Sequence, residues 1–308
     1  GTGSAPPAGT NNITSFNITS DTALVWLWAT NYWLDLTPGG LGELDAATGW
    51  FAAGSNVTIT ATPSNGWHFA GWSGDIASTN NPLVIPMNQA YLLTATFAIN
   101  EYTLGVTSAH GNPIPAGVTT NNWDDFLNPT VEAWEQVGLT QYVCVGWTGT
   151  GSAPPAGTNN ITSFNIVSDT TLVWLWTTNY WLDLTLAGDG GLNAISGWFA
   201  GGSNATITAT PSNGWRFAGW SGDLTTTNNP LVLPMGQAYA LTATFAINEY
   251  TLDVTSAYGT PNPAGTTTNP WNTLINASVA GSPVMNGTTQ YVCMGWSGWG
   301  SVPALGTG

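Results

Sequence analysis

The chain has almost no positive charge. Its 308 residues contain one arginine, Arg216, no lysine and 16 acidic residues, for a formal net charge of −15. Binding to nucleic acid needs a cationic face, so this composition excludes nucleic acid as a partner. Attraction to an anionic membrane surface is excluded for the same reason. No apolar run approaches the roughly 20 residues that a membrane-spanning helix needs, so we also expect no membrane insertion.

Groups suited to catalysis are scarce as well. The chain has two histidines, His68 and His110, and an internal repeat described below replaces them by Arg216 and Tyr258. An active site needs acids, bases or nucleophiles that converge on one pocket, and a catalytic group that is missing from its own duplicate is a weak candidate. We therefore predict no enzyme activity, no catalytic residues, no metal site and no cofactor.

The two cysteines, Cys144 and Cys293, occupy equivalent positions in two repeats. Cysteines so far apart in a linear array are poorly placed to bridge, and two cysteines make no disulfide framework. A cysteine outside a disulfide is among the most buried residue types. We expect two buried thiols.

Apolar and aromatic residues are plentiful, at 43% and 12% of the chain, so packed cores can form. The segment NVTITAT at 56–62 alternates apolar residues with threonine, the period of a half-buried strand. Turn sequences such as PSNG and SGD separate strand-length runs. The sequence predicts an all-β protein, built as a tandem array of small β-sandwich or open-barrel modules.

The chain repeats itself with a period of about 148 residues. The segment TATPSNGWHFAGWSGD at 60–75 returns at 208–223 with one change, and LTATFAINEYTL at 93–104 returns at 241–252. Each period holds two module types, which we call A and B. The predicted boundaries place the last strands of a split B module at 1–30, A modules at 31–100 and 179–248, a complete B module at 101–178, and a B module lacking its last strands at 249–308.

The two ends of the sequence carry complementary parts of one B module. We expect the open module at 249–308 to be completed in one of two ways. Either residues 1–30 of a neighbouring subunit add the missing strands, as in other cases of strand donation, or the same sequence continues in a longer chain. A head-to-tail exchange that does not close on itself builds a filament.

The pattern of the A modules, GSNVTITATPSNGW followed by GWSGD, NPL and LTATF, resembles the divergent B-repeat family related to the internalin B repeat. Its most specific element is GWSGD, at 71–75 and 219–223. The resemblance implies a module of large bacterial surface or secreted proteins, with spacer, adhesion or filament roles. It also implies that there are no catalytic residues to transfer.

The last strand of the B module is apolar on both faces, at 24–28 and again at 172–176. We expect Val25 and Leu27 to fill the completed module, and Trp26 and Trp28 to pack on a neighbour. The residues predicted to form the interface between modules or subunits are Ile13, Phe16, Ile18, Leu24, Val25, Trp26, Leu27, Trp28, Leu172, Trp174, Trp176, Tyr250, Leu252, Val254, Tyr291, Cys293 and Trp296.

Four asparagines in Asn-x-Ser/Thr sequences keep their register across the repeat, so they are candidate glycosylation sites. They are Asn12, Asn56, Asn160 and Asn204. The alternative is that these asparagines are ordinary exposed polar residues at strand edges.

These observations favour a non-enzymatic structural protein of an extracellular or cell-surface filament or stalk, whose partners are copies of itself in a head-to-tail homopolymer. The alternative is an adhesin or carbohydrate-binding module that uses exposed tryptophans. Burial of the B-strand tryptophans would favour the filament, and a solvent-facing row beside polar residues would favour sugar binding.

Overall fold

The computed structural model describes residues 1–306, and all regular structure in this range is β-strand. The all-β prediction is confirmed. The chain divides into two compact bodies, one formed by 1–131 and 146–175 and the other by 132–145 and 176–308. The segment 132–145, which belongs to the complete B module by sequence, is thus part of the body that holds the second A module. The module boundaries themselves stay a prediction.

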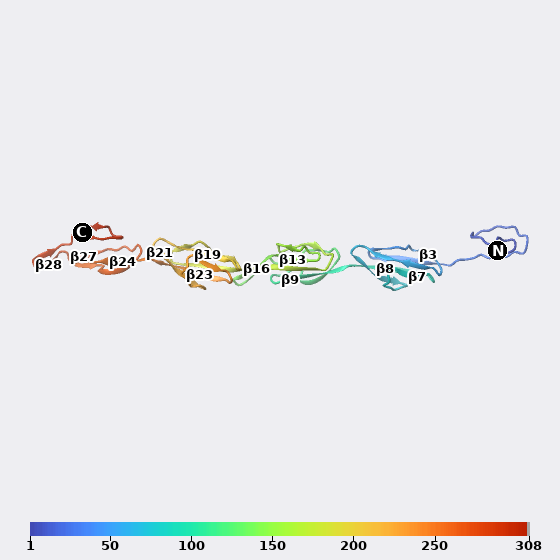
Figure 1. The fold of residues 1–308 in the computed structure, drawn as a ribbon, viewed down its shortest axis with the longest axis horizontal. Coiled ribbons are helices and arrows are strands. Elements are labelled where there is room, and N and C mark those ends of the chain that lie inside the picture. Colours follow the sequence, from blue (N-terminus) through green and yellow to red (C-terminus); the bar gives the residue numbers. More distant parts are fainter. Residues whose placement is uncertain (307–308) are drawn as a thin grey trace. The chain divides into compact units, whose positions relative to one another are not determined.

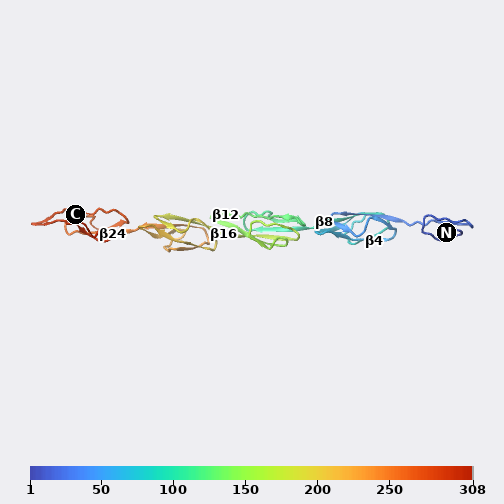
Figure 2. The same cartoon turned by 90° about the horizontal axis from the view of Figure 1, so that it is seen from above.

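The first A module contains eight strands, β1 to β8. It is drawn in blue to cyan in Figures 1 and 2. A four-stranded sheet has the order β3-β1-β8-β6, in which β1 and β8 run parallel and the other neighbours antiparallel. Two short ribbons, β2-β5 and β4-β7, complete the module. The strands are β1 (Asn31–Gly39), β2 (Gly42–Leu44), β3 (Gly49–Ala52), β4 (Asn56–Ile59), β5 (Ala61–Pro63), β6 (Trp67–Gly74), β7 (Leu83–Pro86) and β8 (Tyr91–Ile99).

The core of this module follows from the period of two in its strands. Strand β8 buries Tyr91, Leu93, Ala95 and Phe97, as the alternation of its sequence predicts. The ribbon β4-β7 adds Val57, Ile59, Leu83 and Ile85 to the same cluster. Each Å² of apolar surface removed from water stabilises the fold by about 25 cal/mol. This burial supplies the stability that charge pairs cannot give in this chain.

The GWSGD motif joins β6 to the core and to β8. The register between β6 and β8 shifts between Phe69 and Gly71, where Gly71 has φ 149°. The next residue, Trp72, is buried, and its indole N–H donates to the carbonyl of Asn80 over 2.9 Å. The Asp75 carboxylate accepts from the backbone N–H of Leu92 over 2.7 Å. Because its partner lies on β8, the Asp75 carboxylate links the SGD turn to that strand.

Asn81 forms a second cross-link in the A module. Its side-chain oxygen accepts from the backbone N–H of Ala61 over 2.9 Å, and its amide nitrogen donates to the Ala61 carbonyl over 2.6 Å. Asn229 makes the same two bonds to Ala209 in the second A module. A side-chain amide thus satisfies both backbone groups of a buried residue, where the sequence NNP indicates only a turn.

The complete B module also pairs its first and last strands in parallel. Its strands lie in the order β10-β9-β16-β13-β12, and β16 pairs in parallel with β9. The strands are β9 (Glu101–Ser108), β10 (Gly117–Asn122), β11 (Phe126–Leu127), β12 (Trp134–Val137), β13 (Thr140–Thr150), β14 (Ala156–Gly157), β15 (Phe164–Asn165) and β16 (Thr170–Ala187). Strand β16 continues past the B module and also supplies the first strand of the second A module.

The two faces of β16 are the reverse of our expectation. Leu172 and Trp174 are buried. Leu172 pairs with Val106 of β9, which is also buried, so these side chains lie on one face of the sheet. The alternate residues Val173 and Leu175 are 41% and 39% exposed. Of the residues predicted to form the interface, Leu172 and Trp174 therefore face the inside of the B module, and Trp176 is half-buried. The larger side chains fill the module because the neighbouring strand presents its own buried residues on that side.

The second A module repeats the first, with β16, β18, β21 and β23 in place of β1, β3, β6 and β8. The strands of residues 249–306 form two-stranded sheets only, and residues 1–30 form no strand. The remaining strands are β17 (Gly190–Leu192), β18 (Gly197–Ala200), β19 (Asn204–Ile207), β20 (Ala209–Pro211), β21 (Trp215–Gly222), β22 (Leu231–Pro234), β23 (Tyr239–Ile247), β24 (Glu249–Val254), β25 (Thr260–Asn262), β26 (Gly265–Pro270), β27 (Ser278–Ala280), β28 (Val284–Asn286), β29 (Thr289–Tyr291), β30 (Trp296–Ser297) and β31 (Leu305–Gly306).

We predict that Asn81→Ala destabilises the first A module. It removes both partners of the Ala61 backbone, and an unsatisfied buried polar group costs about 1–3 kcal/mol. Hydrogen exchange at the Ala61 amide should speed up accordingly, whereas Asn80→Ala, which keeps both bonds from Asn81 to Ala61, should leave that exchange unaltered. Equal exchange in the two variants would contradict the role assigned to Asn81.

Candidate functional site: the joints between modules

An A module meets the following B module at a tryptophan seated on a glycine. The backbone N–H of Trp123 donates to the Asn100 carbonyl over 2.7 Å, and the Asn100 N–H donates to the Gly66 carbonyl over 2.8 Å. Gly66 has φ 77°, and a Cβ placed there would overlap the Trp123 indole. The joint therefore requires glycine both for its backbone conformation and for its lack of a side chain.

The same joint occurs a second time, between the second A module and 249–306. The N–H of Trp271 donates to the Asn248 carbonyl over 2.7 Å, the N–H of Asn248 donates to the Gly214 carbonyl over 2.8 Å, and a Cβ on Gly214 would overlap the Trp271 indole. This joint is therefore built by the fold at each A-to-B boundary, whichever sequence differences surround it.

The residues His68 and Arg216 hold equivalent positions beside these joints. The His68 ring lies 2.9 Å from the Asn100 side-chain oxygen, and the Arg216 guanidinium donates to the Ile247 carbonyl over 2.8 Å. Each side chain reaches the end of its A module. Both side chains contact the end of their own A module, so a histidine and an arginine can occupy the same position at the joint.

The B-to-A joint uses the hairpin β12-β13. The backbone N–H of Trp181 on β16 donates to the Leu139 carbonyl in the hairpin turn over 3.0 Å. The side-chain amide of Asn179 donates to the Gln141 side-chain oxygen over 3.2 Å. The hairpin thus packs on the first strand of the A module that follows it, in keeping with its place in the second compact body.

A polar contact closes the complete B module next to the β9-β16 pair. The Asp169 carboxylate accepts from the backbone N–H of Thr103 over 2.8 Å and from its hydroxyl over 2.9 Å. These two bonds, the backbone one first, lower the pKa of Asp169 below its usual value because they favour the charged form. Residues far apart in the module are joined here, immediately before β16 begins.

The interface residues predicted in 1–30 are uncovered. Trp26 is 46% exposed, whereas its equivalent in the complete module, Trp174, is 2% exposed. The segment keeps a loop in which the Ser4 hydroxyl accepts from the backbone N–H groups of Thr19 and Ser20, as Ser152 does for its own loop. Large apolar side chains exposed in this segment are Ile13, Phe16, Ile18, Leu24, Val25, Trp26, Leu27 and Trp28.

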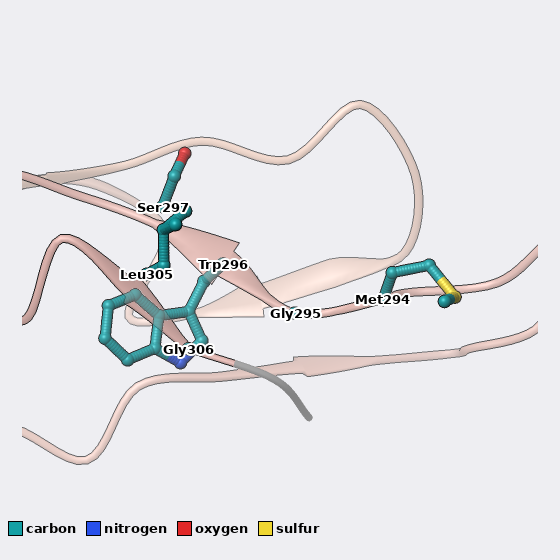
Figure 3. Close-up of a pocket in the computed structure, with 6 residues that line it drawn as sticks. All are labelled: Met294, Gly295, Trp296, Ser297, Leu305 and Gly306. Carbon is teal, nitrogen blue, oxygen red and sulfur yellow. The ribbon is translucent and has the colours of Figure 1, made fainter.

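The interface residues predicted in 249–308 also lie on an open part of the module. Tyr250 and Trp296 are exposed, and Leu252, Val254 and Tyr291 are half-buried. Trp296 is 47% exposed, but its equivalent in the complete module, Trp147, is 5% exposed. The Trp296 indole lies over Gly306 at the side of a shallow hollow, with Met294 pointing away from it (Figure 3). The side chain equivalent to a buried one in 101–178 thus lines a hollow open to solvent in 249–306.

The two thiols differ in exposure, and neither belongs to a disulfide. Cys144 is half-buried and Cys293 is exposed, so the expectation of two buried thiols was wrong. Cys293 lies just after β29, in the part of the chain where the strands form two-stranded pairs only. The difference follows from the state of the module and not from the local sequence, which is QYVC in both copies.

The candidate glycosylation sites are not equivalent. Asn12, Asn56 and Asn204 are exposed, so their side chains are accessible to modification. Asn160 is half-buried, and its amide nitrogen donates to the Val131 carbonyl over 2.8 Å. A glycan on that nitrogen would compete with this bond.

The contacts that matter most at the joints were missed at the sequence level. Trp123 and Trp271 stand at equivalent positions in the repeat, and Gly66 and Gly214 follow PSN in each A module. The recurrence of both residues was the available signal. Their pairing could not be read from it, because the sequence gives no distance between residues in different modules.

Within residues 1–306, no group of three or more histidine, cysteine, aspartate or glutamate side chains is arranged to hold a metal ion. That range also contains no helix of the length and apolar character required to cross a bilayer.

We predict that Gly66→Ala destabilises the A-to-B joint more than Gly54→Ala destabilises its own turn. Both residues have positive φ, 77° and 79°, but a Cβ on Gly54 meets open space. The backbone conformation costs each variant about 1–2 kcal/mol, and only Gly66→Ala must also displace Trp123. Hydrogen exchange at the Trp123 amide should rise more than tenfold in Gly66→Ala and stay unchanged in Gly54→Ala. Equal exchange in both variants would show that the indole does not lie on Gly66.

We predict that Asp169→Ala loosens the complete B module at neutral pH. Because the folded-state pKa of Asp169 is lowered, its stabilisation is present above the ordinary pKa of an unfolded aspartate, about 3.9, and is lost as the pH falls through the lower folded-state value. Hydrogen exchange at the Thr103 amide should be faster in the variant at pH 7, and the difference should shrink at the acid end. A difference that does not change with pH would contradict this assignment.

The comparisons with known proteins agree with this architecture. Residues 32–101 and 180–249 each match the divergent InlB B-repeat domain, and no curated protein matches the chain. The two matched regions coincide with the A modules, including β6 with its GWSGD motif and the parallel pairs β1-β8 and β16-β23. Two regions of the chain, 148 residues apart, are therefore similar to the divergent InlB B-repeat domain and repeat it in tandem.

Proposed function

We propose that this protein is a non-enzymatic structural element of an extracellular or cell-surface filament or stalk, in which A and B modules alternate. The family supports a repeat protein of the surface type, found on bacterial surfaces or secreted. The two A-to-B joints support a spacer role, because they repeat the same contacts without any charged pair. Backbone hydrogen bonds and buried aromatic side chains do not depend on charge pairs, so they can stabilise a chain in which only 6% of residues are charged.

The observation that carries the proposal is the β9-β16 pair of the complete B module. There, 170–174 pair in parallel with 104–108. The equivalents of these strands are 22–26 and 252–256, which lie in the segment 1–30 and in the open module. Their inner side chains are exposed or half-buried, whereas those of the complete module are buried.

In the proposed assembly, residues 1–30 of one copy complete the module 249–308 of the next. Leu24 and Trp26 enter the core, as Leu172 and Trp174 do, while Val25 and Leu27 face outward. In a longer polypeptide, the same residues would follow in the chain and complete the module in the same register. Both routes satisfy the backbone groups of an otherwise unpaired strand edge.

A carbohydrate-binding role has less support. The tryptophans of the complete B strand are buried or half-buried, so they offer no row of rings to solvent. The exposed pair Trp33 and Trp50 meets at 68° between ring planes, an edge-to-face arrangement and not a flat platform.

Cross-linking tests the strand exchange. In a background with both cysteines replaced by serine, we predict that Val25→Cys combined with Thr255→Cys gives a ladder of covalent oligomers. The equivalents Val173 and Thr107 are paired neighbours on the outward face of the complete module, and neighbouring strands lie within disulfide range, at about 4.8 Å. Val25→Cys with Thr251→Cys, four residues out of register, is the control.

Only monomer in both variants would contradict exchange between copies. The intact mass of natural material under denaturing conditions then decides between the two routes. A mass near 32.1 kDa supports separate subunits, and a much larger mass supports a continuous chain.

A further inference from the structure

The two A modules carry the same pair of tryptophans in different surroundings. Trp33 on β1 and Trp50 on β3 are 38% and 67% exposed. Their equivalents on β16 and β18, Trp181 and Trp198, are both half-buried. The ring geometry is the same in both copies, with centroids 5.2 and 5.3 Å apart and interplanar angles of 68° and 72°. The difference in exposure therefore comes from what surrounds each pair and not from the pair itself.

The surroundings differ by the hairpin β12-β13. This hairpin lies in the same compact body as the second A module. The Leu139 carbonyl in its turn accepts a hydrogen bond from the backbone N–H of Trp181. Asn179 and Gln141 add the side-chain bond at the same place. The first A module has the matching residues Asn31 and Trp33, and both are exposed.

The chain holds a second copy of this hairpin in the open B module. It is formed by β28 and β29, which pair antiparallel around Gly287 as β12 and β13 pair around Gly138. The two glycines share a left-handed conformation, with φ 59° and 62°. Allowing for the one-residue insertion, Gln290 matches Gln141 and Thr288 matches Leu139.

We propose that the Trp33–Trp50 pair is a docking surface for the β28-β29 hairpin of a second copy of this chain. In the docked state the backbone N–H of Trp33 donates to the Thr288 carbonyl, and the side-chain amide of Asn31 donates to the Gln290 side-chain oxygen. The inference rests on the proposed function, because strand exchange by 1–30 brings the first A module next to the module that holds this hairpin. It adds a second, separate contact to that exchange.

Charge favours this hairpin as the occupant. Copies with a net charge of −15 repel each other, so a contact between them is best made from uncharged surfaces. Residues 284–291 contain no acidic residue, whereas the β12 strand of the other hairpin contains Glu135. The Trp33–Trp50 pair supplies apolar area, and exposed tryptophans that become covered often dominate the energy of an interface.

The test uses the 308-residue chain with both cysteines replaced by serine and a short bis-maleimide cross-linker. Asn31→Cys combined with Gln290→Cys should give an intermolecular ladder. The matched control is Asn179→Cys combined with Gln141→Cys, which should close within one chain because the wild-type side chains are in contact. Val25→Cys with Thr255→Cys reports strand exchange in parallel.

The outcomes separate the two ideas. Ladders from both intermolecular pairs support both. A ladder from Val25→Cys with Thr255→Cys alone, while the control pair cross-links within one chain, overturns the docking surface and leaves the strand exchange. A ladder from Asn31→Cys with Gln290→Cys alone supports the docking surface and overturns the exchange. No ladder from either pair overturns both contacts between copies.

A substitution gives an independent readout. Trp50→Ala should raise the concentration at which the chain assembles by about tenfold or more, the usual effect of removing a tryptophan from the centre of an interface. Trp198→Ala changes the equivalent residue inside the chain and should leave that concentration within about threefold. Equal effects of the two variants would overturn the docking surface, because a general loss of stability would then explain both.

Discussion

Each complete module depends on a parallel pair between its first and its last strand. In the A modules these pairs are β1-β8 and β16-β23, and in the B module the pair is β9-β16. A strand at the start of a module therefore has no partner on that side until the rest of the module has been supplied. The burial of Trp147 and Trp174 goes with this closure, whereas the equivalent residues Trp296 and Trp26 are exposed.

Much of this fold could be predicted from the sequence. The repeat, the strand alternation that buries Leu93 and Ile59, and the family motif around Trp72 are local patterns, and the structure agrees with each. The faces of β16 could not be predicted, because a strand that is apolar on both sides has a clear period of two but no indication of which side is inner. The partner strand decides, and Leu172 faces inward beside Val106.

The joints escaped prediction for a related reason. A glycine after a turn usually serves the turn alone, and Gly54 does so. Gly66 serves a second purpose, since Trp123 of the next module occupies the space where a Cβ would be. Nothing in the local sequence separates these two glycines. The bond from Trp181 to Leu139 was equally hidden, because a backbone hydrogen bond leaves no trace in side-chain chemistry.

The near absence of cations explains which contacts the joints can use. With one arginine in the chain, carboxylates find backbone N–H groups as partners, as Asp75 and Asp169 do, and the module ends are joined by indole rings and backbone amides. These contacts are short-ranged, so they act only when two modules are already in register, whereas the repulsion between acidic surfaces acts over about 10 Å at moderate salt. An interface in such a chain gains specificity from this balance, because partial or misaligned contacts retain the repulsion without the apolar burial that offsets it.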